Sequence, residues 1–200
     1  MEISVENPCV PNIESLPSIP FKPAATAFAL GDLASAERLL EREHDIMARD
    51  NPDSLETLQM ADALGEIRLR MQNPGKAVEV LEPALETCEL SYGNGHAGFL
   101  KLQNNLGCAH VLAQEGDRAV ELLRHTSGAR TMLLGPDHPL SLNADNNLAC
   151  AYVLQKKLAD AEKIFVRVVS ARERDLGEDH FTTVVTRANL AHVRMLMSAS

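Results

Sequence analysis

The residues of this chain that could do chemistry gather in the stretch Leu134–Ala149, which reads LGPDHPLSLNADNNLA. It places the carboxylate of Asp137 directly beside the imidazole of His138. Three asparagines follow this pair: Asn143, Asn146 and Asn147. A carboxylate next to a histidine is the arrangement expected of a general base or of part of a metal site. Whether the pair does this chemistry depends on the elements that position it.

The pair belongs to a pattern that recurs along the chain at a constant spacing. The repeated columns are Gly93/Gly135/Gly177, His96/His138/His180, Asn105/Asn147/Asn189 and Ala77/Ala119/Ala161. A zinc ligand must lie about 2 Å from the ion, whereas packed helices are about 8–10 Å apart. Histidines one repeat apart therefore cannot share a metal ion, and we interpret them as residues of a turn between repeats.

These turns carry residues that end one helix and begin the next. The glycine supplies the left-handed residue that follows a helix, and Asn51 takes its place in the first copy. Asp53, Asp137 and Asp179 stand where a side chain could cap the following helix. We therefore interpret the Asp137–His138 pair as architecture.

Two further motifs give no chemistry either. The stretch Gly93–Gly98 reads GNGHAG, which fits the dinucleotide fingerprint G-x-G-x-x-G, but it follows a predicted helix rather than a strand. Cys108 and Cys150 stand one repeat apart, too far for a disulfide, which needs Cα atoms within about 7 Å. With Cys9 and Cys88 they fit reduced thiols. We expect no catalytic residue, no metal site and no cofactor.

Hydrophobic spacing predicts two helices in each repeat. In the best-formed copy the first spans Pro139–Gln155 and the second Leu158–Leu176. Neither can bury its apolar face alone, so the hairpins must stack on their neighbours. Further helices are predicted over Pro23–Leu30, Leu33–Arg49 and Phe181–Met197.

The two ends of the chain differ from the repeats. Residues 1–23 hold five of the ten prolines, so we expect an extended arm there. The last predicted helix lacks a partner helix and ends on Val193, Met195, Leu196 and Met197. Two interpretations stay open for it: it binds a partner or a second copy, or it packs adequately on the preceding hairpin.

The stretch LGPDHPLSLNADNNLACAYVLQKKLADAEKIF, residues 134–165, resembles the tetratricopeptide repeat (TPR), and the 42-residue spacing is similar to its kinesin-light-chain-like subclass. The resemblance implies an all-α fold, a right-handed superhelical solenoid of antiparallel helix hairpins. It would hold about three full repeats and partial repeats at both ends. The expected domains are an arm at 1–23 and a helical repeat domain at 24–200.

In that family the first helices line a concave groove, and the resemblance places polar residues of this chain in it. The expected peptide-binding residues are Lys101, Asn104, Asn105, Asn143, Asn146, Asn147, Asn189 and His192. Neighbouring groove positions are Asp62, Glu66, Cys108, Cys150 and Val185. Amide side chains both donate and accept hydrogen bonds, so the asparagines could hold the backbone of an extended peptide. Alternatively they bond to the next repeat and set the superhelix, and the two roles are compatible.

Composition limits the partners. The net charge of −9 argues against nucleic acid and against an anionic membrane surface. Neither a long apolar run nor a secretory signal is recognisable, and we expect a cytoplasmic protein.

The leading interpretation is a non-enzymatic scaffold that binds an extended peptide or a partner protein in the groove. Residues 1–23 are tethered to the repeats, which gives them a high effective concentration at the groove, and they could occupy it as a competitor. A homodimer through the C-terminal helix is a further prediction.

Two alternatives come from other classes of protein. The first is an enzyme or small-molecule binder on a helical scaffold, with His192 and Cys150, or His110, as candidate residues. The second is the sensor or interaction arm of a larger protein.

Overall fold

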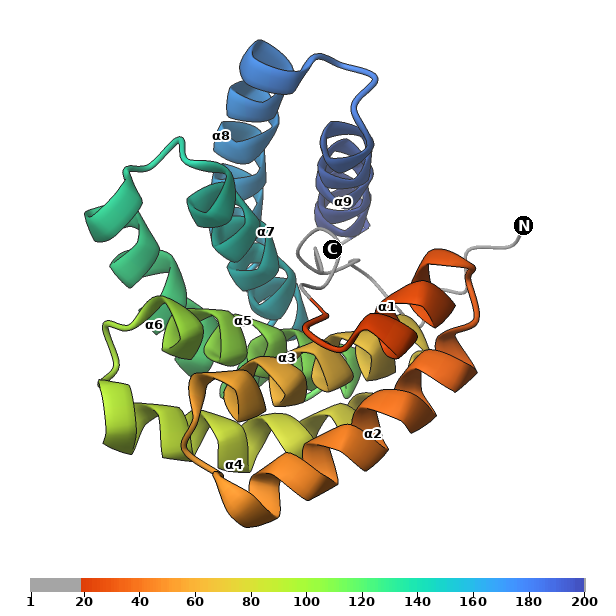
Figure 1. Cartoon of the computed structure of the whole chain (residues 1–200). Coiled ribbons are helices and arrows are strands. Elements are labelled where there is room, and N and C mark those ends of the chain that lie inside the picture. Colours follow the sequence, from red (N-terminus) through yellow and green to blue (C-terminus); the bar gives the residue numbers. More distant parts are fainter. Residues whose placement is uncertain (1–18, 200) are drawn as a thin grey trace. The chain divides into compact units, whose positions relative to one another are not determined.

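The computed structural model describes residues 19–199, which form nine α-helices and no β-strand (Figure 1). The helices are α1 (Lys22–Ala29), α2 (Leu33–Asp50), α3 (Leu55–Arg70), α4 (Pro74–Tyr92), α5 (Ala97–Leu112), α6 (Gly116–Leu134), α7 (Pro139–Leu154), α8 (Leu158–Leu176) and α9 (Phe181–Ser198). The all-α hairpin prediction is confirmed for this part of the chain. The observed α8 has the predicted bounds, whereas α7 ends one residue earlier than predicted and α9 one residue later. Most of the predicted arm, residues 1–18, lies outside the described residues.

The described chain divides into two compact units, with the boundary between Ala109 and His110 inside α5. In the first unit α1 packs on α2, α2 on α3 and α3 on α4. In the second unit α6 packs on α7, α7 on α8 and α8 on α9, and α7 also contacts α9. Each unit is therefore a stack of hairpins in which a first helix lies between second helices.

Each unit has its own apolar core. In the first unit Leu40, Leu64 and Leu81 are fully buried. The core of the second unit gathers around Phe165, and α9 contributes Val193 to it. Burial of these side chains supplies the driving force that neither helix of a hairpin could supply alone.

The last helix is only partly covered. Its Leu190 and Val193 are buried against the preceding hairpin, as expected if the last helix packs adequately on that hairpin. Met195 and Met197 are exposed, so the homodimer stays a prediction. No helix in residues 19–199 is long and apolar enough to span a membrane.

The turns between repeats use glycine in a conformation that other residues avoid. Gly93, Gly135 and Gly177 follow helices with φ of 80°, 94° and 89°, so the predicted positive φ is confirmed. Their ψ angles of 162°, 159° and 165° place them in the extended region open essentially to glycine, not in the left-handed helical region. Asn51, with φ of −145°, does not reproduce this conformation, so its predicted equivalence to the glycines is wrong.

The left-handed helical residues occur instead inside the hairpins. Gln72, Gln114 and Lys156 have φ of 56°, 63° and 59°, and each stands one repeat after the one before it. In each case the next N–H reaches back to a carbonyl five residues earlier, as from Glu115 to His110 at 2.9 Å. This hydrogen bond closes the first helix of the hairpin.

Candidate interaction site on the first helices

The repeated histidines act as helix caps. His138 and His180 occupy the N-cap positions of α7 and α9, and their Nδ1 atoms accept hydrogen bonds from the backbone N–H of Leu140 (3.2 Å) and Thr182 (3.3 Å). His96 accepts in the same way from the N–H of Gly98, at 3.1 Å. The histidines therefore belong to the turns, as the sequence indicates.

The predicted capping role of the aspartates is wrong. Each precedes the true cap by one residue, so its carboxylate is displaced from the free N–H groups of the first turn. Ser54, not Asp53, caps α3 and accepts from the N–H of Thr57 at 3.1 Å. Asp137 instead pairs with Arg174 of α8, at 3.0 Å.

No three metal-ligating side chains lie together anywhere in residues 19–199. Cys88, Cys108 and Cys150 are buried free thiols, and Cys9 lies outside the described residues. Of the enzyme candidates, His110 pairs through Nδ1 with Glu115 Oε2 at 2.6 Å, next to the turn that opens α6. Cys150 Sγ accepts from Asn189 Nδ2 at 3.7 Å.

In the first unit the predicted groove residues of α3 and α5 contact one another. Asp62 is 5% exposed, and its Oδ1 accepts from Asn105 Nδ2 at 2.8 Å. Its Oδ2 pairs with Lys101 Nζ at 2.5 Å. Lys101 remains partly accessible, whereas Asn104 and Asn105 are fully buried. The structure thus brings together Lys101, Asn105 and Asp62 as one polar cluster.

Glu66 lies one helical turn after Asp62 and is fully buried. Its Oε1 accepts from Arg70 at 2.9 Å, but the buried Oε2 has no hydrogen-bond partner. Burial raises the pKa of this carboxyl from 4.5 to about 7, against the opposing effect of Arg70. α3 therefore carries a buried carboxyl group whose pKa is raised toward neutral pH.

In the second unit the predicted groove asparagines form hydrogen bonds within their own helix or with a helix packed against it. Asn189 of α9 donates to Asn146 Oδ1 of α7 at 3.4 Å, and Asn146 donates to Asn147 at 3.3 Å. Asn143 is half-buried and accepts from Arg172 at 2.6 Å. His192 is half-buried too, and its Nε2 atom is buried without a partner.

These contacts between helices match the alternative in which the asparagines set the stacking of the repeats. The structure does not test a peptide-binding role for the same residues, which stays a prediction.

The structure also reveals a pocket that the sequence did not predict. It has a volume of about 420 Å³ and lies between the start of α3, the end of α4 and the start of α5. Its lining residues are Leu55, Leu58, Gln59, Asp62, Cys88, His96, Ala97, Gly98, Lys101 and Leu102. We call it the α3–α5 pocket. Leu55 is an apolar residue at the first position of α3 and remains 43% exposed. It is the one feature of the sequence that could have indicated this pocket.

The fold and the polar first helices place the chain among the repeat proteins built from helix hairpins. The model of the tetratricopeptide-repeat family matches residues 24–89 and 98–174. The chain belongs to the tetratricopeptide-repeat family, whose repeat fold is typical of protein–protein interaction.

Solved structures of kinesin-light-chain-like repeats are similar to this chain. One is a protein from Podosopora anserina assigned as a kinesin light chain with nearly identical TPR-like repeats. It has a TM-score of 0.73 and 22% identity, with 89% of this chain and 85% of that chain covered. A single-substitution variant of the same protein has a TM-score of 0.75 and 22% identity, with coverage of 89% and 84%.

A second neighbour is BtubC (BKLC) from P. vanneervenii, with a TM-score of 0.72 and 20% identity over 88% of this chain and 70% of that chain. At these identities the likeness shows the fold. No curated protein matches the chain.

Proposed function

We propose that this protein is a non-enzymatic interaction scaffold of the cytoplasm that binds an extended peptide segment of a partner protein along its first helices. The observation that carries the proposal is the α3–α5 pocket, which adjoins the Lys101–Asp62 ion pair. Its volume of about 420 Å³ falls in the range of about 300–1,000 Å³ that is usual for binding pockets.

The lining of the pocket suits an apolar side chain with a peptide backbone beside it. Leu55, Leu58 and Leu102 give it an apolar wall. At its border Lys101 can donate to a peptide carbonyl, and the exposed amide of Gln59 can both donate and accept. The pocket would thus select one apolar residue of the peptide, while the polar border holds its backbone.

The buried asparagines support this site indirectly. Asn105 fixes Asp62, and Asp62 in turn fixes Lys101, so the border of the pocket is held before any peptide arrives. A preformed border lowers the entropy lost on binding. The half-buried Asn143 and His192 are the predicted groove residues of the second unit with the most accessible side chains for direct contact.

The test uses peptides selected from a random displayed library against the full chain. Ala97 and Gln59 are exposed and line the pocket, so Ala97→Trp and Gln59→Trp should obstruct it without disturbing the core. We expect each to weaken the selected peptides about tenfold or more, the loss of one well-buried side chain contact. Glu56→Trp, on the exposed side of α3 outside the pocket, is the matched control.

Two results would contradict the proposal. One is that the library yields no peptide that binds the full chain. The other is equal binding to all three tryptophan variants.

The competing role of the arm, residues 1–23, is tested with the same peptides. Deletion of residues 1–20 should tighten their binding if the arm occupies the groove, and unchanged affinity would exclude it.

A further inference from the structure

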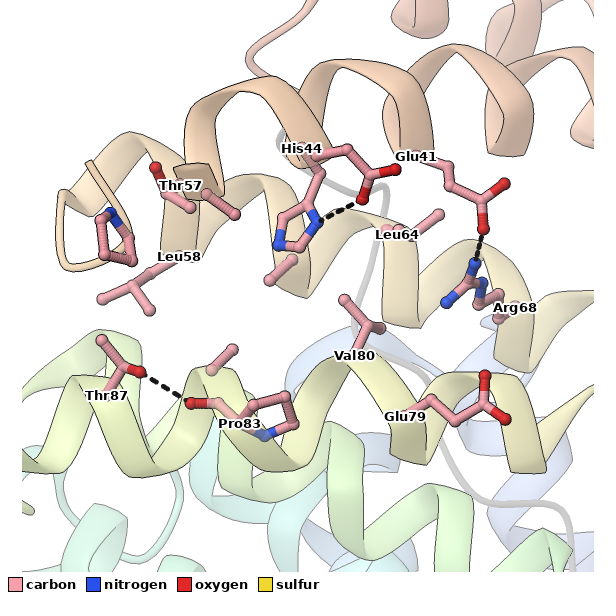
Figure 2. A pocket seen from close by; sticks show the side chains of 15 residues that line it. Glu41, His44, Thr57, Leu58, Leu64, Arg68, Glu79, Val80, Pro83 and Thr87 are labelled. Carbon is pink, nitrogen blue, oxygen red and sulfur yellow. Dashed lines mark hydrogen bonds and ion pairs between the residues drawn. The ribbon is translucent and has the colours of Figure 1, made fainter. Parts of the chain in front are cut away.

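A second cleft opens on another part of the first unit, between α2 and α4 and over α3 (Figure 2). We call it the α2–α4 cleft. Its volume is about 340 Å³, and its floor consists of buried apolar residues: Ala61, Leu64, Val80 and Ala84. Figure 2 shows Val80 and Pro83 of α4 facing this space from the side opposite His44 and Glu41 of α2.

The α2–α4 cleft carries an excess of negative charge. Glu41 and Asp45 of α2 and Glu79 of α4 line it, against a single permanent cation, Arg68. Arg68 is already held by Glu41 at 2.5 Å and by Glu37 at 3.1 Å. Burial lowers the pKa of His44 despite the nearby Asp45, so this ring adds no charge at neutral pH. Glu79 makes no ion pair within residues 19–199.

The second unit fills the same place with its own side chain. Two repeats later in the chain, Arg167 stands where α4 has Pro83, and Asp145 stands where α3 has Ala61. Arg167 Nη2 pairs with Asp145 Oδ2, and Arg167 Nη1 donates to the carbonyl of Pro136 at 3.2 Å. An arginine of α8 thus bridges the gap to α7 in the second unit.

The borders of the two equivalent places also differ in charge. Where the first unit has Glu41, Asp45 and Glu79, the second unit has His125, Ala129 and Lys163. Glu41 is paired with Arg68, so Asp45 and Glu79 are the two border carboxylates left to meet a further cation. The equivalent positions of the second unit, Ala129 and Lys163, carry no carboxylate. A vacant apolar cleft with a negative border is complementary to an arginine side chain, which has an apolar stem and a cationic head.

We propose that the α2–α4 cleft is a second docking site, which takes an arginine side chain from a partner protein. The stem lies over Ala61 and Val80, and the guanidinium meets the carboxylates of the border. The carbonyl of Pro52, which aligns with that of Pro136, offers the equivalent acceptor. The arm of this chain cannot supply the side chain, because residues 1–23 contain no arginine.

The test is a titration of the full, isotope-labelled chain with Nα-acetyl-arginine methylamide. NMR chemical shifts of Ala61, Val80 and Ala84 are measured at each step of the titration. The citrulline analogue, which has nearly the same shape but no charge, is the matched probe. Saturable shifts with the arginine probe and none with citrulline are expected. Asp45→Asn combined with Glu79→Gln should weaken the arginine probe about fivefold, as the loss of two partly exposed charge contacts implies.

Variants that place residues of the second unit in the first unit show whether the probe binds in the α2–α4 cleft or elsewhere on the chain. Ala61→Asp combined with Pro83→Arg rebuilds the Asp145–Arg167 pair in the first unit and should abolish probe binding. Pro83→Ala removes the same proline but leaves the cleft open, and it should bind the probe like the natural chain. Circular dichroism checks that each variant is folded.

Three results would overturn the proposal: equal binding of citrulline, shifts that persist in the rebuilt variant, or self-association of the chain that the rebuilt variant abolishes. The last would make a second copy the occupant. Because Ala97 and Gln59 do not line this cleft, their tryptophan variants should still bind the probe. Failure of this proposal is therefore distinguishable from failure of the peptide-binding proposal.

Discussion

Asn105 of α5 donates a 2.8 Å hydrogen bond to Asp62 of α3, and the two residues stand 43 positions apart. Asn189 of α9 makes the same kind of contact to Asn146 of α7, again 43 positions apart and at 3.4 Å. Asparagine is a mediocre helix former, so its recurrence in the middle of first helices has a structural reason. In both pairs the amide joins one first helix to the next, as expected if the asparagines fix the spacing of the repeats.

Substitution of Asn105 by alanine should destabilise the first unit. Asp62 would lose a buried donor, which typically costs about 1–2 kcal/mol. Urea denaturation measures the change in the free energy of unfolding. Gln59→Ala, at an exposed position of α3, is the control and should change it by less than about 0.5 kcal/mol. Equal effects of both variants would mean that the Asn105–Asp62 contact contributes nothing measurable.

Two helical glycines should respond to alanine in opposite directions. A Cβ added at Gly65 would lie 2.6 Å from Leu81, which is itself fully buried and cannot move away. Gly65→Ala should therefore cost about 1–3 kcal/mol. Gly128 is exposed within α6 and has open space around it, so Gly128→Ala should stabilise by about 1 kcal/mol. Thermal unfolding of both variants measures these changes in stability. A stabilising Gly65→Ala would show that α3 and α4 are not closely packed.

The left-handed residues inside the hairpins give a second route to higher stability. Gln114 and Lys156 are exposed and adopt a conformation that costs a side chain about 1–2 kcal/mol. After allowance for the greater freedom of glycine in the unfolded chain, Gln114→Gly and Lys156→Gly should each gain about 0.5–1 kcal/mol. Gly135→Ala, in contrast, should lose about 1–3 kcal/mol, because its φ of 94° and ψ of 159° suit glycine alone. If both glycine variants were less stable in urea, their side chains would have to make contacts that outweigh the strain.

Glu66 should make the stability of the first unit depend on pH. Its folded-state pKa of about 7 lies above the ordinary 4.5, so the folded chain keeps this proton when the unfolded chain has released it. The stability that the neutral form provides is complete below pH 4.5 and is lost as the pH rises through 7. The full difference is of the order of 3 kcal/mol.

Glu66→Gln isolates this effect, because the amide stays neutral and can still accept from Arg70. The variant should match the natural chain near pH 4.5 and exceed it in urea resistance at pH 8. Asp62 and Lys101, which act on Glu66 with opposite charges, are the same in both proteins. A constant difference between the two proteins from pH 4.5 to 8 would show that Glu66 does not titrate in this range.

Local sequence information was sufficient to predict the repeat and its helices. Side chains at helical spacing, and breaks that recur once or twice in every repeat, are local properties, and they placed α8 at Leu158–Leu176. The need for positive φ at Gly93, Gly135 and Gly177 is local too, since only the backbone of that turn decides it. The caps were predicted at the neighbouring residue, because a shift of one position changes which side chain reaches the free N–H groups.

What the repeated residues touch follows only from the packing of the helices. Asn105 could have faced a peptide or the next helix, and the stacking of α5 against α3 pairs it with Asp62. The same holds for the two cavities. Pro83 and Ala61 are ordinary residues in the sequence, and their small volume matters only because Arg167 and Asp145 meet across the equivalent gap. Contacts between residues far apart in the chain depend on how whole helices stack, and short-range sequence patterns carry no information about that.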